Sequence, residues 1–333
     1  MSTLVVVTQA VDPDDPVLAA TLAKLRALAA RVDELVVLAD RVVSGSLPDN
    51  CVTHSFGASS KVARGTRYLA ALTPVVAKRP LAVVAHMAPV YAVLAAPLAR
   101  PLRVPLLLWF TQQRGGRLLQ VAERVADVVL TVDPRSVPLR SSKVRAIGHG
   151  IDVAAFPCVA ERRPPLRRLL GLGRYAPVKG WETVLRALPE LPEATLTLQG
   201  PMLTPGDRAH RPALERLAAE LGVQDRVTFG DEVAYRDVPG LLEAADALVN
   251  ATRGNAADKV VYEAAASCLP VFAASPVFDT LLPKHLRFDA DSPTSLADRI
   301  RSYDAGAGRD LRARVEAEHS VEHWADEVLE AAR

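Results

Sequence analysis

The chain has 333 residues, half of them apolar, and a formal net charge of +2. This length exceeds the usual size of a single hydrophobic core, so two domains are expected. No apolar run approaches the roughly 20 residues that a membrane-spanning helix needs, so no such helix is expected and the protein is predicted to be soluble.

Short apolar runs alternate with longer amphipathic segments through the first half. This rhythm is typical of βαβ units and a parallel sheet. We expect strands at residues 4–7, 34–38, 81–85, 104–110, 128–132 and 144–147, and helices at 16–30, 62–78, 90–99 and 118–125.

Residues 156–168, rich in proline and charge, interrupt the pattern as a linker between domains would. A second βα series follows, so two doubly wound sheets are predicted in tandem, with ligands beyond the carboxyl ends of their strands and a cleft between them. The strands are expected at 168–172, 194–199, 227–229, 247–249 and 270–274, and the helices at 181–188, 213–221, 238–244, 259–267 and 321–333.

The three cysteines, Cys51, Cys158 and Cys268, stand far apart and have no histidines in metal-ligand spacing. They predict neither structural zinc nor a disulfide framework. The chain runs into its first strand without the basic, apolar and small-residue segments of a secretory signal. We therefore expect it in the cytoplasm.

Charge is distributed unevenly along the chain. Residues 1–150 carry 18 Lys and Arg against 10 Asp and Glu, whereas the remainder carries 22 against 28. A basic first half suits a phosphorylated acceptor or peripheral contact with the inner membrane face. Ordinary solvated arginines on helices explain the same asymmetry, and no nucleic-acid partner is expected.

The strongest local signal is the passage LLGLGRYAPVKGWETVLRAL. It places Arg174 and Lys179 in the loop after a predicted strand, just before a helix begins. Two cations beside a helix N-terminus favour the binding of an anion such as a sugar diphosphate. A solvated loop with one capping lysine is the alternative.

Several segments of the second half, in the same order, resemble family 4 of the retaining glycosyltransferases. These are GHGID at 148–152, Gly173-Arg174 with Lys179-Gly180, QGP at 199–201, VTFG at 227–230 and DKVVYEA at 258–264. The resemblance implies an α/β protein of the GT-B fold, with two Rossmann-like, doubly wound domains facing a central cleft. It implies an acceptor-binding domain at 1–152, a nucleotide-sugar-binding domain at 153–318, and a C-terminal helix at 319–333 that packs back on the first domain.

In that family an arginine and a lysine grip the donor diphosphate, and the resemblance assigns these catalytic roles to Arg174 and Lys179. Charge that develops on a departing diphosphate is stabilised by such cations. A metal ion is then dispensable, so no metal or cofactor is expected. The donor site is expected to include Gly200, Phe229, Gly230, Gly254, Asn255, Ala256, Ala257, Asp258, Lys259 and Glu263.

Glu263 lies in VVYEAAASCL, a helix that is otherwise apolar nearly all round. A buried carboxylate needs partners, and the hydroxyls of a nucleotide ribose are suitable donors. This is the role that the resemblance implies. A basic side chain or a backbone amide inside the protein is the alternative.

The loop before this helix departs from the family pattern, because Asn255 stands where an acidic residue is usual. Gly254 and the alanines still allow backbone N–H groups to approach a ligand. Asp258 begins the helix whose positive end would face the diphosphate, and Lys259 would add a third cation. Alternatively, Asp258 caps the helix and Lys259 points to solvent.

The first half carries a weaker signal. The strand that ends in Trp109-Phe110 lacks the histidine that relatives place near the reacting sugar, and His86 is the nearest candidate for a catalytic role. A histidine packed at the end of a strand is the alternative. Asp12, Asp14 and Asp15 lie where an acceptor could bind, or where they could cap a helix beginning at Pro16.

The sequence thus predicts a retaining transferase that moves a sugar, such as a hexose, from a UDP- or GDP-sugar to a hydroxyl acceptor, lipid-linked or anionic, without a metal. Front-face transfer lets the departing phosphate take the acceptor's proton, whereas a hydrolase would need two carboxylates. A binding or scaffold subunit that has lost its chemistry is the alternative. A nicotinamide-dependent dehydrogenase is disfavoured because the first βα turn has no GxGxxG.

Overall fold

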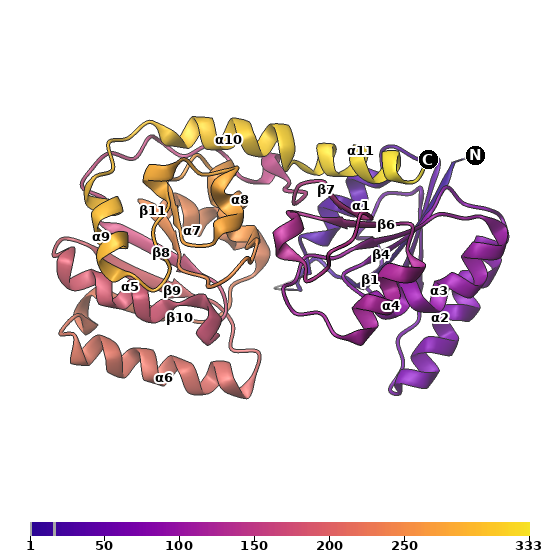
Figure 1. Ribbon diagram of the computed structural model, residues 1–333, viewed down its shortest axis with the longest axis horizontal. Helices are drawn as coiled ribbons and strands as arrows, with labels where there is room; N and C mark the ends of the chain where they lie inside the picture. Colours follow the sequence, from indigo (N-terminus) through magenta and orange to yellow (C-terminus); the bar gives the residue numbers. More distant parts are fainter. Residues whose placement is uncertain (1, 16–17) are drawn as a thin grey trace. The chain divides into compact units, whose positions relative to one another are not determined.

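A computed structural model describes residues 2–15 and 18–333 of the chain (Figure 1). The chain divides into two compact units, with bounds Met1–Asp152 together with Glu318–Arg333, and Val153–Ala317. Each unit is an α/β layer structure built on a parallel sheet. No helix among these residues is long and apolar enough to cross a bilayer.

The first unit contains a seven-stranded parallel sheet in the order β3-β2-β1-β4-β5-β6-β7. The strands are β1 (Thr3–Val11), β2 (Glu34–Val42), β3 (Cys51–Ser55), β4 (Val83–His86), β5 (Leu106–Trp109), β6 (Val128–Thr131) and β7 (Val144–Ala146). The helices are α1 (Thr21–Ala29), α2 (Lys61–Val76), α3 (Pro89–Ala99), α4 (Arg117–Val125) and α11 (Val321–Ala331).

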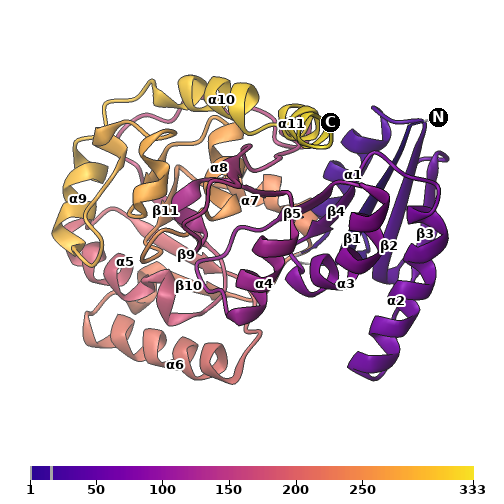
Figure 2. The ribbon, with the colours of Figure 1, turned by 45° about the vertical axis from the view of Figure 1, so that its right-hand side comes forward.

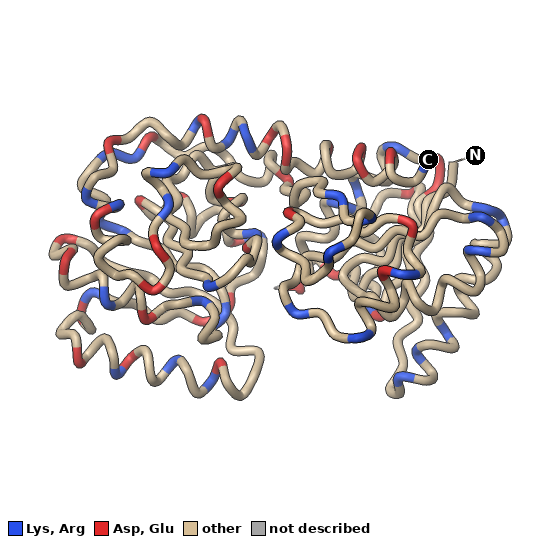
Figure 3. The backbone as a smooth tube through the Cα atoms, viewed as in Figure 1, with Lys and Arg blue, Asp and Glu red and all other residues tan. Residues whose placement is uncertain are grey.

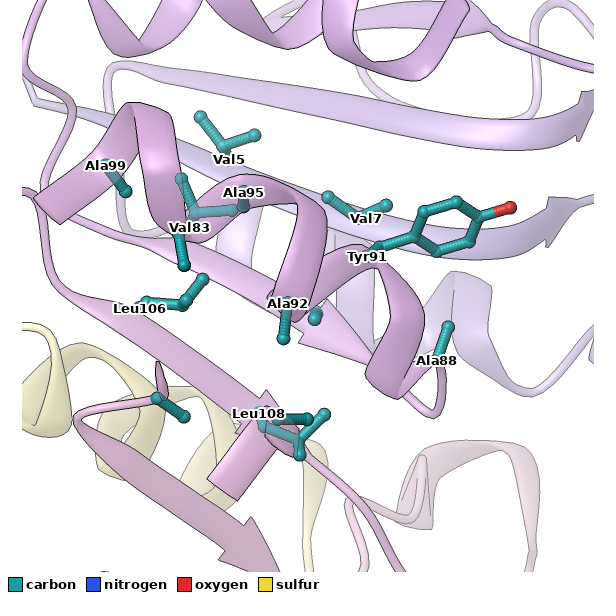
Figure 4. Close-up of a cluster of buried hydrophobic side chains, with 14 of the residues drawn as sticks. Val5, Val7, Val83, Ala88, Tyr91, Ala92, Ala95, Ala99, Leu106 and Leu108 are labelled. Atoms are coloured by element: carbon teal, nitrogen blue, oxygen red, sulfur yellow. The ribbon is translucent and has the colours of Figure 1, made fainter. Parts of the chain in front are cut away.

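A hydrophobic core of this unit lies between the sheet and α2, α3 and α4. Alanines on α3 face valines and leucines of β1, β4 and β5, and all of them are buried (Figure 4). Small side chains let a helix lie close to a sheet, and the branched side chains of the strands then fill the remaining space.

The terminal helix α11 packs beside α1 within the first unit. Trp324 is buried on it, and its ring meets that of Trp109 edge to face, with centroids 5.6 Å apart. The chain also enters this helix through a bridge between Ile151 and Ser320. Residues 318–333 therefore complete the first unit.

The second unit contains a five-stranded parallel sheet in the order β10-β9-β8-β11-β12. The strands are β8 (Arg168–Leu172), β9 (Thr195–Gln199), β10 (Val227–Gly230), β11 (Ala247–Asn250) and β12 (Val271–Ala273). The helices are α5 (Trp181–Ala187), α6 (Pro205–Glu220), α7 (Val238–Ala244), α8 (Lys259–Ala266), α9 (Pro293–Arg301) and α10 (Ala307–Glu318), which Figure 2 shows from a second direction.

Several predicted elements differ from those observed. Strand β3 and helices α9 and α10 were not predicted, because β3 is mostly exposed and the two helices are rich in charge. Helix α6 begins at Pro205 rather than at 213, because a capping box between Thr204 and Asp207 starts it and its interior tolerates Pro212. Helix α1 begins at Thr21, and the predicted start at residues 16 and 17 lies outside the described residues.

The expectation that the cysteines form no disulfide was wrong, because Cys158 and Cys268 are bonded across 110 residues of sequence. Cys268 follows α8, and Cys158 lies in the segment expected to be a linker. That segment belongs to the second unit, where the backbone N–H of Val159 donates to the Ser267 carbonyl and Nε of Arg162 donates to the Ala245 carbonyl. Sequence spacing could not predict this pair, because only tertiary packing brings the two ends together.

Replacing Cys158 by serine should lower the free energy of unfolding of the second unit by about 2–4 kcal/mol, because the bond restricts a long loop in the unfolded chain. Thermal unfolding with and without a reducing agent measures the effect. Cys51→Ser is the control, since Cys51 is a free cysteine. Identical melting of the oxidised and reduced parent protein would contradict the prediction.

Candidate functional site

The carboxyl ends of β8 and β9 meet closely in the second unit. A Cβ added at Gly200 would lie 2.1 Å from the carbonyl oxygen of Gly173, so only glycine fits there. A Cβ at Gly173 would in turn lie 3.3 Å from Cε of Lys179. The lysine side chain therefore runs alongside the residue that precedes Arg174.

A short 3-10 turn, Pro177–Lys179, holds Lys179 in this position, and Gly180 ends it. Gly180 has a φ of +65°, and a Cβ there would lie 2.4 Å from the Ala251 carbonyl oxygen. Arg253 completes the link, since its backbone N–H donates to the Val178 carbonyl. The turn that carries Lys179 and the loop after β11 are thus packed directly against each other.

The ammonium of Lys179 forms an ion pair with Asp258, with 2.7 Å between Nζ and Oδ2. Asn250 and Thr252 also donate hydrogen bonds to Oδ2 of Asp258. Burial opposes ionisation of this carboxyl group, but the Lys179 charge and these hydrogen bonds outweigh it and lower its pKa below the ordinary value. Asp258 occupies the N-cap position of α8, as predicted, but its side chain makes no cap hydrogen bond to that helix.

Arg174 is more accessible, with 41% of its side chain exposed. Its Nη1 lies 3.6 Å from Oδ2 of Asp207, a buried carboxylate. Asp207 also accepts the backbone N–H groups of Leu203 and Thr204 at the start of α6. This acidic partner of Arg174 was not predicted, although the capping pattern of Thr204 and Asp207 is readable in the sequence.

Glu263 is 2% exposed, as the apolar helix predicted. The Tyr235 hydroxyl donates to its Oε1 over 2.8 Å, and Nζ of Lys259 lies 3.0 Å from the same oxygen. Nζ of Lys259 also lies 3.8 Å from the centre of the Tyr235 ring. The arrangement matches the alternative weighed for Glu263, a basic partner inside the protein, and Lys259 does not point freely to solvent.

The remaining donor-site candidates lie on two stretches. Gly254 has a φ of +75°, which suits glycine, and Asn255, Ala256 and Ala257 are half-buried beside it. Phe229 and Gly230 end β10 on the other side of the sheet. Their carbonyls accept hydrogen bonds from Arg211 and from the Tyr175 hydroxyl, both 2.8 Å long.

The structure therefore brings Arg174, Lys179 and Lys259 to the carboxyl edge of one sheet, but each is paired with a carboxylate. The three cations predicted for the diphosphate site are thus balanced by three carboxylates, those of Asp207, Asp258 and Glu263. Figure 3 shows basic and acidic residues interspersed in the same way over the second unit. Among residues 2–15 and 18–333, no three His, Cys, Asp or Glu side chains gather as a metal site.

His86 lies in the first unit, at the carboxyl end of β4, and is buried. Its Nδ1 is 3.2 Å from Oγ1 of Thr8, whereas no hydrogen-bond partner within the described residues reaches its Nε2. Burial, together with the nearby charge of Lys24, lowers the pKa of His86 well below its ordinary value. His86 is thus packed at the end of its strand, and its lowered pKa favours the neutral imidazole.

Lys24 is a residue that the sequence analysis missed. It is buried, and its Nζ lies 4.7 Å from the Trp109 ring centre and 5.1 Å from that of Trp324. Cations bind the faces of tryptophan rings, and desolvation strengthens the contact. Nothing in the local sequence distinguishes this lysine from an exposed helical one.

Residues 167–303 match the family model described as Glycosyl transferases group 1. D-inositol 3-phosphate glycosyltransferase from Mycobacterium marinum is 27% identical in an alignment of 244 residues that covers 64% of this chain and 51% of that protein. Lipopolysaccharide core biosynthesis glycosyltransferase LpsD from Rhizobium meliloti is 30% identical in an alignment of 183 residues that covers 49% of this chain and 50% of that protein. The chain spans about half the length of these curated relatives, and the matches confirm the resemblance drawn from the motifs.

Solved structures are similar over nearly the whole chain. Alr3699/HepE from Anabaena, in complex with UDP and glucose, has a TM-score of 0.74 at 17% identity and covers 99% of both chains. Sucrose-phosphate synthase from Thermosynechococcus elongatus has a TM-score of 0.72 at 20% identity, covering 98% of this chain and 97% of that one. The α/β class and the GT-B fold are thereby confirmed.

The buried histidine predicts how the stability of the first unit depends on pH. His86 has a lowered pKa in the folded state and an ordinary value of 6.5 when unfolded, so the unfolded chain gains a proton first as pH falls. The contribution of His86 to the free energy of unfolding is complete above pH 6.5. Below that pH this contribution falls, by at most about 1.4 kcal/mol per pH unit.

Urea unfolding at about pH 7.5 and about pH 5.5 measures this loss. His86→Gln should reduce it, leaving the part due to His319, whose pKa burial lowers to about 4. His54→Gln is the control, because His54 lies on the exposed strand β3. A His86→Gln variant that keeps the full acid-dependent loss would contradict the assignment.

Proposed function

We propose, from the premise that residues 167–303 belong to the group 1 glycosyl transferases, that the chain transfers a sugar from a nucleoside diphosphate sugar to a hydroxyl acceptor. The observation that carries the proposal is the position of Lys179 and Arg174 at the carboxyl edge of a parallel sheet. Ligands of doubly wound sheets bind at this edge. The nearby α8 adds the positive end of a helix.

UDP-sugars are the donors we favour. Three of the similar structures are HepE complexes with UDP, with UDP and glucose, or with UDP-glucose. The donor is proposed to bind the second unit, with its diphosphate between Arg174 and Lys179. Glu263 would accept hydrogen bonds from the ribose hydroxyls, in place of the one that Tyr235 now donates.

We further propose that transfer retains the anomeric configuration and needs no metal. The bond from the anomeric carbon to the diphosphate oxygen breaks, and the acceptor oxygen forms the new bond on the same face. The acceptor's proton passes to the departing phosphate oxygen. Arg174 and Lys179 stabilise the charge on this oxygen, which is the task that a divalent cation performs elsewhere.

The acceptor is proposed to carry negative charge and to bind the first unit. The relatives act, by their names, on D-inositol 3-phosphate and in lipopolysaccharide core biosynthesis. Residues 1–150 carry the excess of basic residues. A lipid-linked phosphate at the inner membrane face is one acceptor of this class. His86 would contribute as a neutral imidazole.

A nucleotide-binding subunit without transferase activity is the second candidate. Two observations favour it: an amide, Asn255, replaces the usual acidic group, and Lys179 is already paired with Asp258. The two candidates differ in one measurement, because only an enzyme releases free nucleotide from the sugar donor when an acceptor is present.

A panel of UDP-, GDP- and ADP-sugars tests the proposed function. We expect UDP-sugars to bind in calorimetry and to release UDP with an anionic hydroxyl acceptor, equally with and without excess EDTA. NMR of the product should show the donor's anomeric configuration. Binding without turnover would favour the inactive subunit, inversion or EDTA sensitivity would overturn the mechanism, and absence of binding at millimolar concentration would overturn the donor site.

Removing either cation should slow transfer. Arg174→Ala and Lys179→Ala are each expected to lower kcat by about 10²–10³-fold, the usual cost of losing one donor to a developing oxyanion. Lys284→Ala, at an exposed lysine of the same unit, is the control and should keep full activity. Melting curves verify that the variants fold, and unchanged turnover would remove the substituted residue from the mechanism.

A further inference from the structure

The ion pair between Lys179 and Asp258 is nearly enclosed. Only 14% of the lysine side chain and 16% of the aspartate side chain are exposed. Asn250, which is fully buried, and Thr252 donate hydrogen bonds to Oδ2 of Asp258, the oxygen that contacts Lys179. The ammonium proposed to bind the donor diphosphate therefore already has an anion on it, in a place where water screens little.

Asp258 is also unusual for a residue at the start of a helix. An aspartate at an N-cap ordinarily accepts the N–H groups of the first turn. Asp258 occupies that position before α8 but makes no such bond. Its carboxylate is instead directed to Lys179, so the first turn of α8 and the ammonium do not share one anion.

A diphosphate that contacts Nζ of Lys179 within hydrogen-bond distance would lie close to the Asp258 carboxylate. Like charges at such separations repel strongly when they are partly buried. The donor must therefore draw Lys179 away from Asp258 or share it with that carboxylate. The same condition exists at Lys259, whose ammonium is paired with Glu263.

We propose that Asp258 is an internal competitor of the donor diphosphate for Lys179, and that this competition sets how tightly the nucleotide binds and how fast it leaves. The carboxylate takes the ammonium back after transfer and so favours release of the nucleoside diphosphate. The inference rests on the proposed function. The pKa of Asp258 lies below its ordinary value, in keeping with an anion at neutral pH.

A purely structural role makes the opposite prediction. If Asp258 only holds Lys179 in position, its removal should weaken nucleotide binding, because the ammonium would lose its orientation. If it competes, its removal should strengthen binding. The sign of the change in affinity thus separates the two roles.

The experiment compares the full-length protein with Asp258→Asn by calorimetry against UDP and against uridine. We expect the Kd for UDP to fall about tenfold, mostly through a slower dissociation rate, and the Kd for uridine to stay unchanged because uridine has no phosphate. In steady state, KM for the UDP-sugar and kcat should fall together, and inhibition by added UDP should become stronger.

Asp291→Asn is the matched control. Asp291 is paired with Arg253 of the loop that leads to Asp258, with 2.6 Å between Oδ1 and Nε. The substitution therefore removes one negative charge near the site without changing a contact of Lys179. Its UDP affinity should equal that of the parent protein. Asp258→Ser is a second variant that also lacks the carboxylate, and thermal melting shows which of the two is folded.

Weaker or equal UDP binding by the folded Asp258 variants, when the parent protein binds UDP, would overturn the competition and leave the donor site in place. The competition would also be overturned if the Asp258 variants bound uridine more tightly by the same factor as UDP, or if Asp291→Asn tightened UDP binding as much as they do. If neither the parent nor any variant binds a nucleoside diphosphate, the proposed function itself fails and the inference fails with it.

Discussion

The ion pair between Lys179 and Asp258 is the interaction on which the candidate site depends. It joins the turn after β8 to the loop before α8, and it is supported by glycines that admit no side chain. A buried pair of this kind is costly to break on one side only, because an uncompensated charge remains. The two loops therefore keep a defined geometry without a ligand.

This arrangement gives the second unit the character of a site in which charge is balanced before a ligand arrives. Arg174, Lys179 and Lys259 each have a carboxylate partner. If a diphosphate binds there as proposed, it would exchange one anion for another instead of filling an empty cationic pocket. Such an exchange would lower the net gain from each contact and also the barrier to releasing the product.

The two units differ in how their buried polar groups are satisfied. In the second unit, ion pairs and hydrogen bonds connect loops at the carboxyl edge of the sheet. In the first unit, burial lowers the pKa of His86, and Lys24 lies on tryptophan rings supplied by β5 and α11. Helix α11 at the end of the chain thus supplies one of the two rings that surround the ammonium of Lys24, a residue near the start of the chain.

The sequence by itself determined the alternation of strands and helices, since a period of two or of 3.6 in apolar residues is a local property. It also placed Arg174, Lys179 and Glu263 at strand ends and on an apolar helix, and motif order indicated the family. It could not determine the partners of those residues, because Asp207, Asp258 and Tyr235 meet them only after β8, β9 and β11 are aligned in one sheet. For the same reason, the bond between Cys158 and Cys268 and the contact of Trp324 with Trp109 were decided by the tertiary structure alone: each joins positions far apart in the chain, and no local pattern encodes such a pairing.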